Sequence, residues 1–172
     1  MPASTTGLRG LLTLPSGGPV GSGPPKHRTQ RRPRPCGDWY STRVSSSQAT
    51  TRGVRVHVNA RFSASHSDPQ KREWFFLYTI RIENTGTDTV QLVNRHWIIT
   101  DATGHVEEVR GPGVVGKQPS LKTGESFEYT SGCPLKTPFG SMRGSYEMVT
   151  ERGEHFEAAV APFALRESEA FN

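Results

Sequence analysis

The sequence has no run of about 20 apolar residues, which is the length that a transmembrane helix needs. Among its 172 residues it has two cysteines, Cys36 and Cys133, too few for a disulfide framework and not at metal-ligand spacing, which indicates a reducing compartment. The six histidines form no H-x-H or H-x-x-x-H pair, so we interpret them as surface or structural residues: His27, His57, His66, His96, His105 and His155. The sequence therefore predicts neither a metal site nor a cofactor.

Acidic residues are almost absent from the first 52 positions. That segment has eight Lys or Arg residues and one acid, Asp38, for a net charge of +7, whereas residues 53–172 have a net charge of −2. It is rich in Ser, Thr, Gly and Pro and has no helical or strand periodicity, so it buries too little apolar surface to offset its chain entropy. We predict a disordered basic extension over residues 1–52 and a folded domain over residues 53–172.

Three interpretations of this extension remain open. We favour an extension without function, or a start site placed too far upstream. An Arg-rich, Ser-rich and acid-poor composition is also typical of an organellar transit peptide. Residues 26–35 are a weak candidate for nucleic-acid binding or localisation. We expect a cytoplasmic bacterial protein, or an organellar one if residues 1–52 are a transit peptide.

The folded part shows the period-two alternation of half-buried strands. In residues 54–62, one face holds the apolar side chains: Val54, Val56, Val58, Ala60 and Phe62. Residues 74–84 repeat this pattern with Trp74, Phe76, Tyr78, Ile80 and Ile82. The turn-forming sequence that follows, with Gly86, predicts a hairpin.

The next apolar run, over residues 89–101, changes parity. Val90 and Leu92 share one face, whereas Trp97 and Ile99 share the other, which predicts a β-bulge near Asn94–Arg95. Later runs and a tight turn at Arg152–Gly153 bring the total to about seven strands, with no amphipathic helical window. The pattern predicts an all-β protein, an immunoglobulin- or fibronectin-III-like β-sandwich, with a small barrel as the alternative.

No catalytic motif is apparent. The sequence has no G-x-S-x-G elbow, and Cys133 would be a nucleophile only if a histidine approached it in space; we expect a buried, inert thiol. Glu107 and Glu108 are adjacent strand residues that point to opposite faces, so they do not easily share one substrate or metal. We therefore expect a protein that is not an enzyme.

The sequence GPGVVG, residues 111–116, fits the G-x-G-x-x-G spacing of phosphate-binding loops. A dinucleotide site needs a helix after the glycines, but Pro119 and Gly124 bracket a stretch too short for one. The remaining hypothesis is an anion-binding nest of backbone N–H groups with a positive charge beside it, formed by Gly111, Gly113, Gly116 and Lys117. Pro112 removes one donor, and we favour a crossover loop between sheets.

Three segments together resemble the ApaG family: residues 94–104, 111–132 and 142–148. The resemblance covers about residues 53–168 and implies the β-sandwich fold. Bacterial members are associated with magnesium and cobalt efflux and with diadenosine-tetraphosphate metabolism, whereas the domain's occurrence in eukaryotic F-box and polymerase-interacting proteins implies protein interaction. The family's glycine motif corresponds to Gly111, Gly113 and Gly116, without an established catalytic set.

We therefore expect a non-enzymatic protein-interaction module, with an indirect link to magnesium and cobalt efflux. The alternative is a nucleotide- or pyrophosphate-binding protein that uses residues 111–116. We expect another protein as the partner, no membrane contact, and nucleic-acid binding only through the basic extension. The sequence identifies neither the partner nor an oligomeric state.

Overall fold

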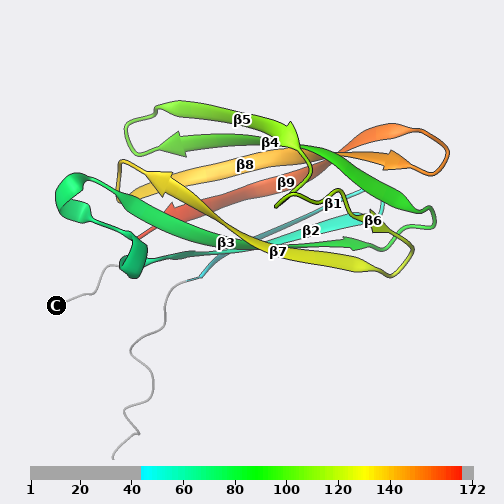
Figure 1. Cartoon of the computed structure of the whole chain (residues 1–172), viewed down its shortest axis with the longest axis horizontal. Helices are drawn as coiled ribbons and strands as arrows, with labels where there is room; N and C mark the ends of the chain where they lie inside the picture. Colours follow the sequence, from blue (N-terminus) through cyan, green and yellow to red (C-terminus); the bar gives the residue numbers. More distant parts are fainter. Residues whose placement is uncertain (1–43, 168–172) are drawn as a thin grey trace, which may run out of the picture. The chain divides into compact units, whose positions relative to one another are not determined.

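The computed structural model describes residues 44–167, which form two antiparallel sheets packed face to face (Figure 1). The first sheet has the order β1-β2-β3-β7, with β1 Ser45–Thr51, β2 Val54–Phe62, β3 Trp74–Asn84 and β7 Ser126–Leu135. The second has the order β5-β4-β8-β9, with β5 Val106–Pro112, β4 Val90–Asp101, β8 Phe139–Thr150 and β9 His155–Arg166, and β6 Ser120–Leu121 also pairs with β4. Two short 3₁₀ helices, η1 Ala64–His66 and η2 Pro69–Lys71, join β2 to β3. The predicted β-sandwich is confirmed.

The core lies between the two sheets and follows the alternation in the sequence. In β2, every second residue from Val54 to Ala60 is at most 2% exposed, and the residues between them face outwards. The inner face of β3 is equally buried from Phe76 to Ile82. Each inward side chain removes apolar surface from water, and this burial is the main stabilising contribution in such a fold.

A β-bulge interrupts β4 at Val93. Leu92 is opposite Met148 on β8, and Asn94 is opposite the preceding residue, Glu147, so Val93 has no partner in the ladder. The extra residue turns every later side chain of β4 to the other face. The parity change in the sequence thus predicted the bulge within two residues of its position.

Strand β1 differs from the predicted boundary of the domain. The sequence predicts that residues 45–51 belong to the basic extension, but they pair with β2 along the full length of β1. Hydrophobic periodicity does not mark this strand, because it consists of Ser, Gln, Ala and Thr and none of its residues is fully buried. The prediction of disorder for positions 1–43 lies outside the described residues.

Side chains of β1 also bond to the backbone of β9, at the edge of the other sheet. The Ser47 hydroxyl donates to the Ala161 carbonyl at 2.9 Å. The hydroxyl oxygens of Ser45 and Thr51 accept hydrogen bonds from the N–H groups of Ala164 and Ala159, at 3.0 and 3.1 Å. We call this row of three contacts the β1–β9 seam; it closes one side of the sandwich.

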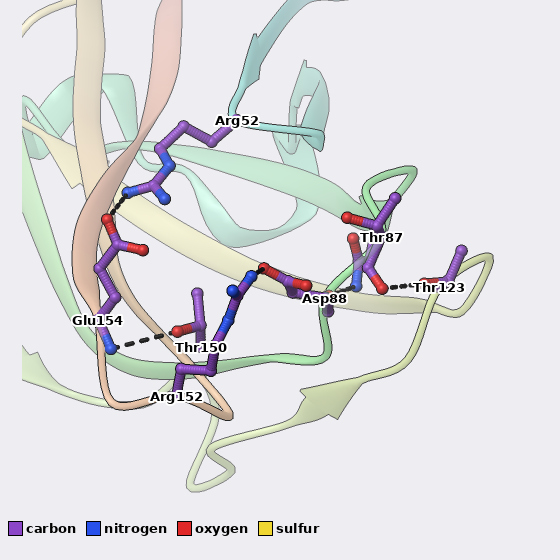
Figure 2. A network of polar contacts seen from close by, with 8 residues as sticks. Arg52, Thr87, Asp88, Thr123, Thr150, Arg152 and Glu154 are labelled. Atoms are coloured by element: carbon purple, nitrogen blue, oxygen red, sulfur yellow. Dashed lines mark hydrogen bonds and ion pairs between the residues drawn. The ribbon is translucent and has the colours of Figure 1, made fainter.

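At one end of the sandwich, exposed polar contacts join the turns (Figure 2). Arg52, in the turn after β1, pairs with Glu154 at 2.8 Å, and Arg152 pairs with Asp88. Thr123 donates to the Thr87 carbonyl at 3.1 Å. Because these ion pairs are largely exposed, each contributes little to stability.

The β1–β9 seam predicts a measurable loss of stability when its hydroxyls are removed. In a triple variant, Ser45→Ala, Ser47→Ala and Thr51→Ala, the free energy of unfolding should fall by about 2 kcal/mol, since each lost hydrogen bond contributes about 1 kcal/mol or less. Urea denaturation measures this change. The matched control, Ser46→Ala with Thr50→Ala, alters outward-facing residues of the same strand and should change stability by less than about 0.5 kcal/mol. Equal losses in the two variants would contradict the role of the seam.

Candidate functional site

The side of the sandwich opposite the seam is open. There β5 and β7 are the edge strands of the two sheets, and each pairs on one side only among the described residues. Between them lies a cavity of about 330 Å³. A neighbouring cavity of about 470 Å³ shares the lining residues Ile99, Glu107 and Pro134 with it, and we call the two adjacent cavities together the groove.

The wall of the groove is mostly apolar. It includes Trp97 and Ile99 from β4, Val109 from β5 and Met142 from β8. The Trp97 ring makes edge contacts with Tyr78 and Tyr146, with ring centroids 5.8 Å apart in both pairs. Apolar walls with a few polar groups are the usual composition of a ligand-binding cleft.

Arg95 is the cation of the 330 Å³ cavity, whereas Lys136 lines the second cavity and pairs with Glu73 at 3.2 Å. Arg95 follows the β-bulge, and therefore faces the same way as Trp97 and Ile99. Its Nη1 donates to the carbonyls of Pro112 and Gly113, at 3.0 and 2.8 Å. Both acceptors are neutral, and no carboxylate of the described residues lies within ion-pair distance of Arg95. Sequence analysis did not select Arg95, although the predicted bulge would have placed it on the inner face.

Three tyrosines lie at the base of the groove or directly beneath it. The hydroxyls of Tyr129 and Tyr146 are 2.5 Å apart and both side chains are buried. Burial raises the pKa of both, and the nearby Arg95 charge opposes that rise. Burial raises the pKa of Tyr78 as well. All three phenols therefore stay neutral near pH 7 and act as hydrogen-bonding groups.

The predicted glycine loop follows β5 and leads to β6, and both strands pair with β4, so the chain reaches β7 of the other sheet only after β6 (Figure 1). Gly111 is opposite Arg95 in the β4–β5 ladder, where a Cβ atom would lie 3.3 Å from the guanidinium nitrogens. Gly113 has φ +56°, and a Cβ atom there would collide with the Lys117 carbonyl. The exposed Gly116 also has a positive φ. The glycines therefore permit a tight turn between two strands of one sheet. The predicted crossover between sheets is wrong for this loop, because the chain passes to the other sheet through residues 122–125, between β6 and β7.

Several donors of this loop are already in use. The Gly113 N–H donates to the Val93 carbonyl at 2.8 Å, and Val114 and Lys117 exchange N–H to carbonyl bonds of 2.8 and 2.9 Å. The Lys117 ammonium lies 5.9 Å from the centre of the Phe127 ring on β7. The structure brings Lys117 close to the predicted glycines, and phosphate binding by these residues stays a prediction.

Glu107 and Glu108 lie on opposite faces of β5, as predicted. Glu108 faces outwards, where it pairs with His96 at 3.0 Å and with Arg110 at 3.5 Å. The His96 hydrogen bond is the largest of the effects that lower the pKa of Glu108. Glu107 instead lines both cavities of the groove, and it forms no ion pair with any residue between 44 and 167.

Cys133, on β7, lines the groove and is 3% exposed. Burial raises the pKa of its thiol to about 12, and the Glu107 charge adds to the rise. Among the described residues that line the 330 Å³ cavity there is no histidine, whereas His66 and His105 line the second cavity, which Cys133 does not line. The thiol is therefore protonated near pH 7, and a protonated thiol is a poor nucleophile.

This pKa predicts slow alkylation of Cys133. In a Cys36→Ser variant, which leaves one thiol, iodoacetamide at pH 8.5 should react with the native protein at least about 100-fold more slowly than with the protein in urea, because only the thiolate reacts. Mass spectrometry of quenched samples measures both rates. Comparable rates in the two states would show that the thiol is accessible and ionised.

These features define a class of protein: an antiparallel two-sheet β-sandwich with one closed side and a groove between the edge strands of the other. The family model described as the ApaG domain matches residues 64–150. The chain belongs to the ApaG family. Among its described residues, no helix is long and apolar enough to cross a membrane.

Individual relatives agree with this assignment. The chain is 56% identical over 118 residues to Protein ApaG of Methylobacterium sp. (strain 4-46), covering 69% of this chain and 91% of that protein. It is also 56% identical over 115 residues to Protein ApaG of Rhodospirillum centenum, covering 67% and 88% of the two chains. A crystal structure of a Bordetella pertussis protein described as ApaA is similar with a TM-score of 0.66 and 51% identity, over 68% of this chain and 95% of that one.

Proposed function

We propose that this protein is a non-enzymatic interaction module that binds an extended segment of a partner protein in the groove. The observation that carries this proposal is the position of the two edge strands. Both β5 and β7 lie on the open side, with an apolar groove between them. An edge strand presents unpaired N–H and C=O groups that an added strand can bond, and adjacent pockets then select its side chains.

A residue with a strained backbone at the rim of the groove also supports partner binding there. Val115 lines the groove, is 53% exposed and has φ +43°. A β-branched side chain at positive φ is uncommon, and such strain costs of the order of 1–3 kcal/mol. Glycine or asparagine would relieve the strain here. Strained residues cluster where proteins hold ligands, and an exposed apolar side chain at the rim suits contact with a partner.

The ionisation of the groove supports a binding role over a chemical one. The Cys133 thiol and the tyrosine hydroxyls are neutral near pH 7 because burial raises the pKa of each. A nucleophile or general base needs a pKa matched to the working pH. These groups are suited to packing and hydrogen bonding.

Blocking the groove should abolish partner binding. We expect affinity purification from the source organism to recover one stoichiometric protein with the wild-type bait and none with Val115→Arg, because the larger charged side chain fills the rim. Val44→Arg is the matched control, since Val44 is equally exposed, at 51%, and does not line the groove. Quantitative mass spectrometry measures recovery. Equal recovery with all three baits, or no stoichiometric partner in several growth conditions, would refute the proposal.

We propose that any link to magnesium and cobalt efflux acts through the bound partner. Glu73, Asp101 and Glu107 line the groove, but no group of three or more His, Cys, Asp or Glu side chains among the described residues could hold a metal ion. Mg²⁺ and Co²⁺ need several deprotonated oxygen, nitrogen or sulfur ligands. Equilibrium dialysis with either ion should show no stoichiometric binding at micromolar concentration. Tight one-to-one binding of Co²⁺ would overturn this expectation.

The cytoplasmic location of the protein stays a prediction.

A further inference from the structure

The 330 Å³ cavity of the groove holds one positive and one negative side chain, Arg95 and Glu107, and neither forms an ion pair within residues 44–167. The second cavity adds Asp101 and the Glu73–Lys136 ion pair. Arg95 lies under the glycine loop, and its guanidinium bonds to neutral carbonyls only. Glu107 lies further along the same wall, where the two cavities meet. Arg95 is half-buried, and a charge removed from water without a counter-charge is costly, whereas Glu107 is exposed and open to a ligand. The two positions together favour a ligand that carries the complementary charges.

The ladder sets the spacing of these charges. Arg95 on β4 is opposite Gly111 on β5. Glu107 is also on β5, four residues before Gly111. Four residues of an extended strand span about 13 Å. In an extended ligand, residues four positions apart point to the same side, so one bound strand can meet both charges at once.

The groove is closed beyond Arg95 and continues in the opposite direction. After β5 the glycine loop leads to β6, which also pairs with β4, and Lys117 of this loop packs over Phe127 of β7 in the other sheet. The buried Val114 side chain fixes this loop in the core. Past Glu107, the second cavity extends the groove towards Trp74 and Lys136. A ligand strand that reaches Arg95 therefore ends there.

We propose that the groove recognises the carboxyl terminus of its partner. The terminal carboxylate binds the Arg95 guanidinium, apolar side chains lie on Trp97 and Val109, and a Lys or Arg four residues before the end faces Glu107. This inference rests on the proposed function, since it specifies which part of the partner enters the groove. Guanidinium groups bind carboxylates through charge-assisted, often bidentate, hydrogen bonds, which discriminate an acid from an amide.

The test uses full-length protein and a library of random octapeptides displayed with free carboxyl termini. Peptides are selected on the wild type and counter-selected on the Val115→Arg variant. The peptide that binds best is synthesised as the free acid and as the C-terminal amide.

Calorimetry should show at least about tenfold weaker binding for the amide, because it lacks the charged hydrogen bonds to Arg95. In Arg95→Gln the two forms should bind within about twofold of each other, whereas Arg110→Gln, which alters an exposed arginine of β5, should keep the wild-type difference. Thermal melting confirms that each variant is folded.

A charge reversal tests the second contact without altering Arg95. In Glu107→Lys, the preferred residue four positions before the end should change from Lys to Glu. The matched control Glu108→Lys alters the adjacent, outward-facing carboxylate and should leave the preference unchanged.

The outcomes separate this inference from the proposed function. Groove-bound peptides that bind equally well as acids and amides overturn the terminal-carboxylate inference alone, and so does a preference that Glu107→Lys leaves unchanged. A library that yields no groove-bound peptide also overturns it. If counter-selection on Val115→Arg removes every peptide that was selected on the wild type, the peptides bind outside the groove, and this outcome overturns both the inference and the use of the groove.

Discussion

The groove depends on the single extra residue in β4. A strand has a period of two, so Val93 alone decides whether Arg95, Trp97 and Ile99 face the interior or the solvent. The bulge also frees the Val93 carbonyl from the ladder, and that oxygen accepts hydrogen bonds from the Gly113 N–H and the Gln118 amide, both at 2.8 Å. One irregularity thus turns the charged and aromatic side chains inwards and anchors the loop above them.

Strand β8, which pairs with β4, accommodates the inward-facing Trp97 ring. Trp97 is opposite Gly144 of β8, and a Cβ atom at Gly144 would collide with the His96 carbonyl and lie 2.8 Å from the Trp97 ring. The β8–β9 pairing has its own register shift between Met142 and Gly144. The register is therefore shifted in two neighbouring pairings, β4–β8 and β8–β9. These shifts let the closely packed interior accommodate the large indole ring without a void.

Period-two alternation was sufficient to predict β2, β3 and the sandwich, because their inner faces are uniformly apolar. It was also sufficient for the bulge, since Leu92 and Trp97 cannot both face inwards without one. It could not predict β1, whose residues are polar and whose partners are distant backbone groups on β9. Nor could it predict the groove, because the proximity of Arg95 to Pro112 depends on the register of β4 and β5, and that of Cys133 to Glu107 depends on how the two sheets pack.

The polar strand β1 has a protective consequence for the rest of the fold. Without it, β2 would present an open edge in which Val54, Val56 and Val58 alternate with polar residues, a pattern that readily pairs with other chains. The hydroxyls of β1 shield the free edge of β9 in the same way. A polypeptide that began at Gly53, the boundary that hydrophobic patterning indicates, would expose both edges together. The least hydrophobic strand of the domain therefore protects it against aggregation.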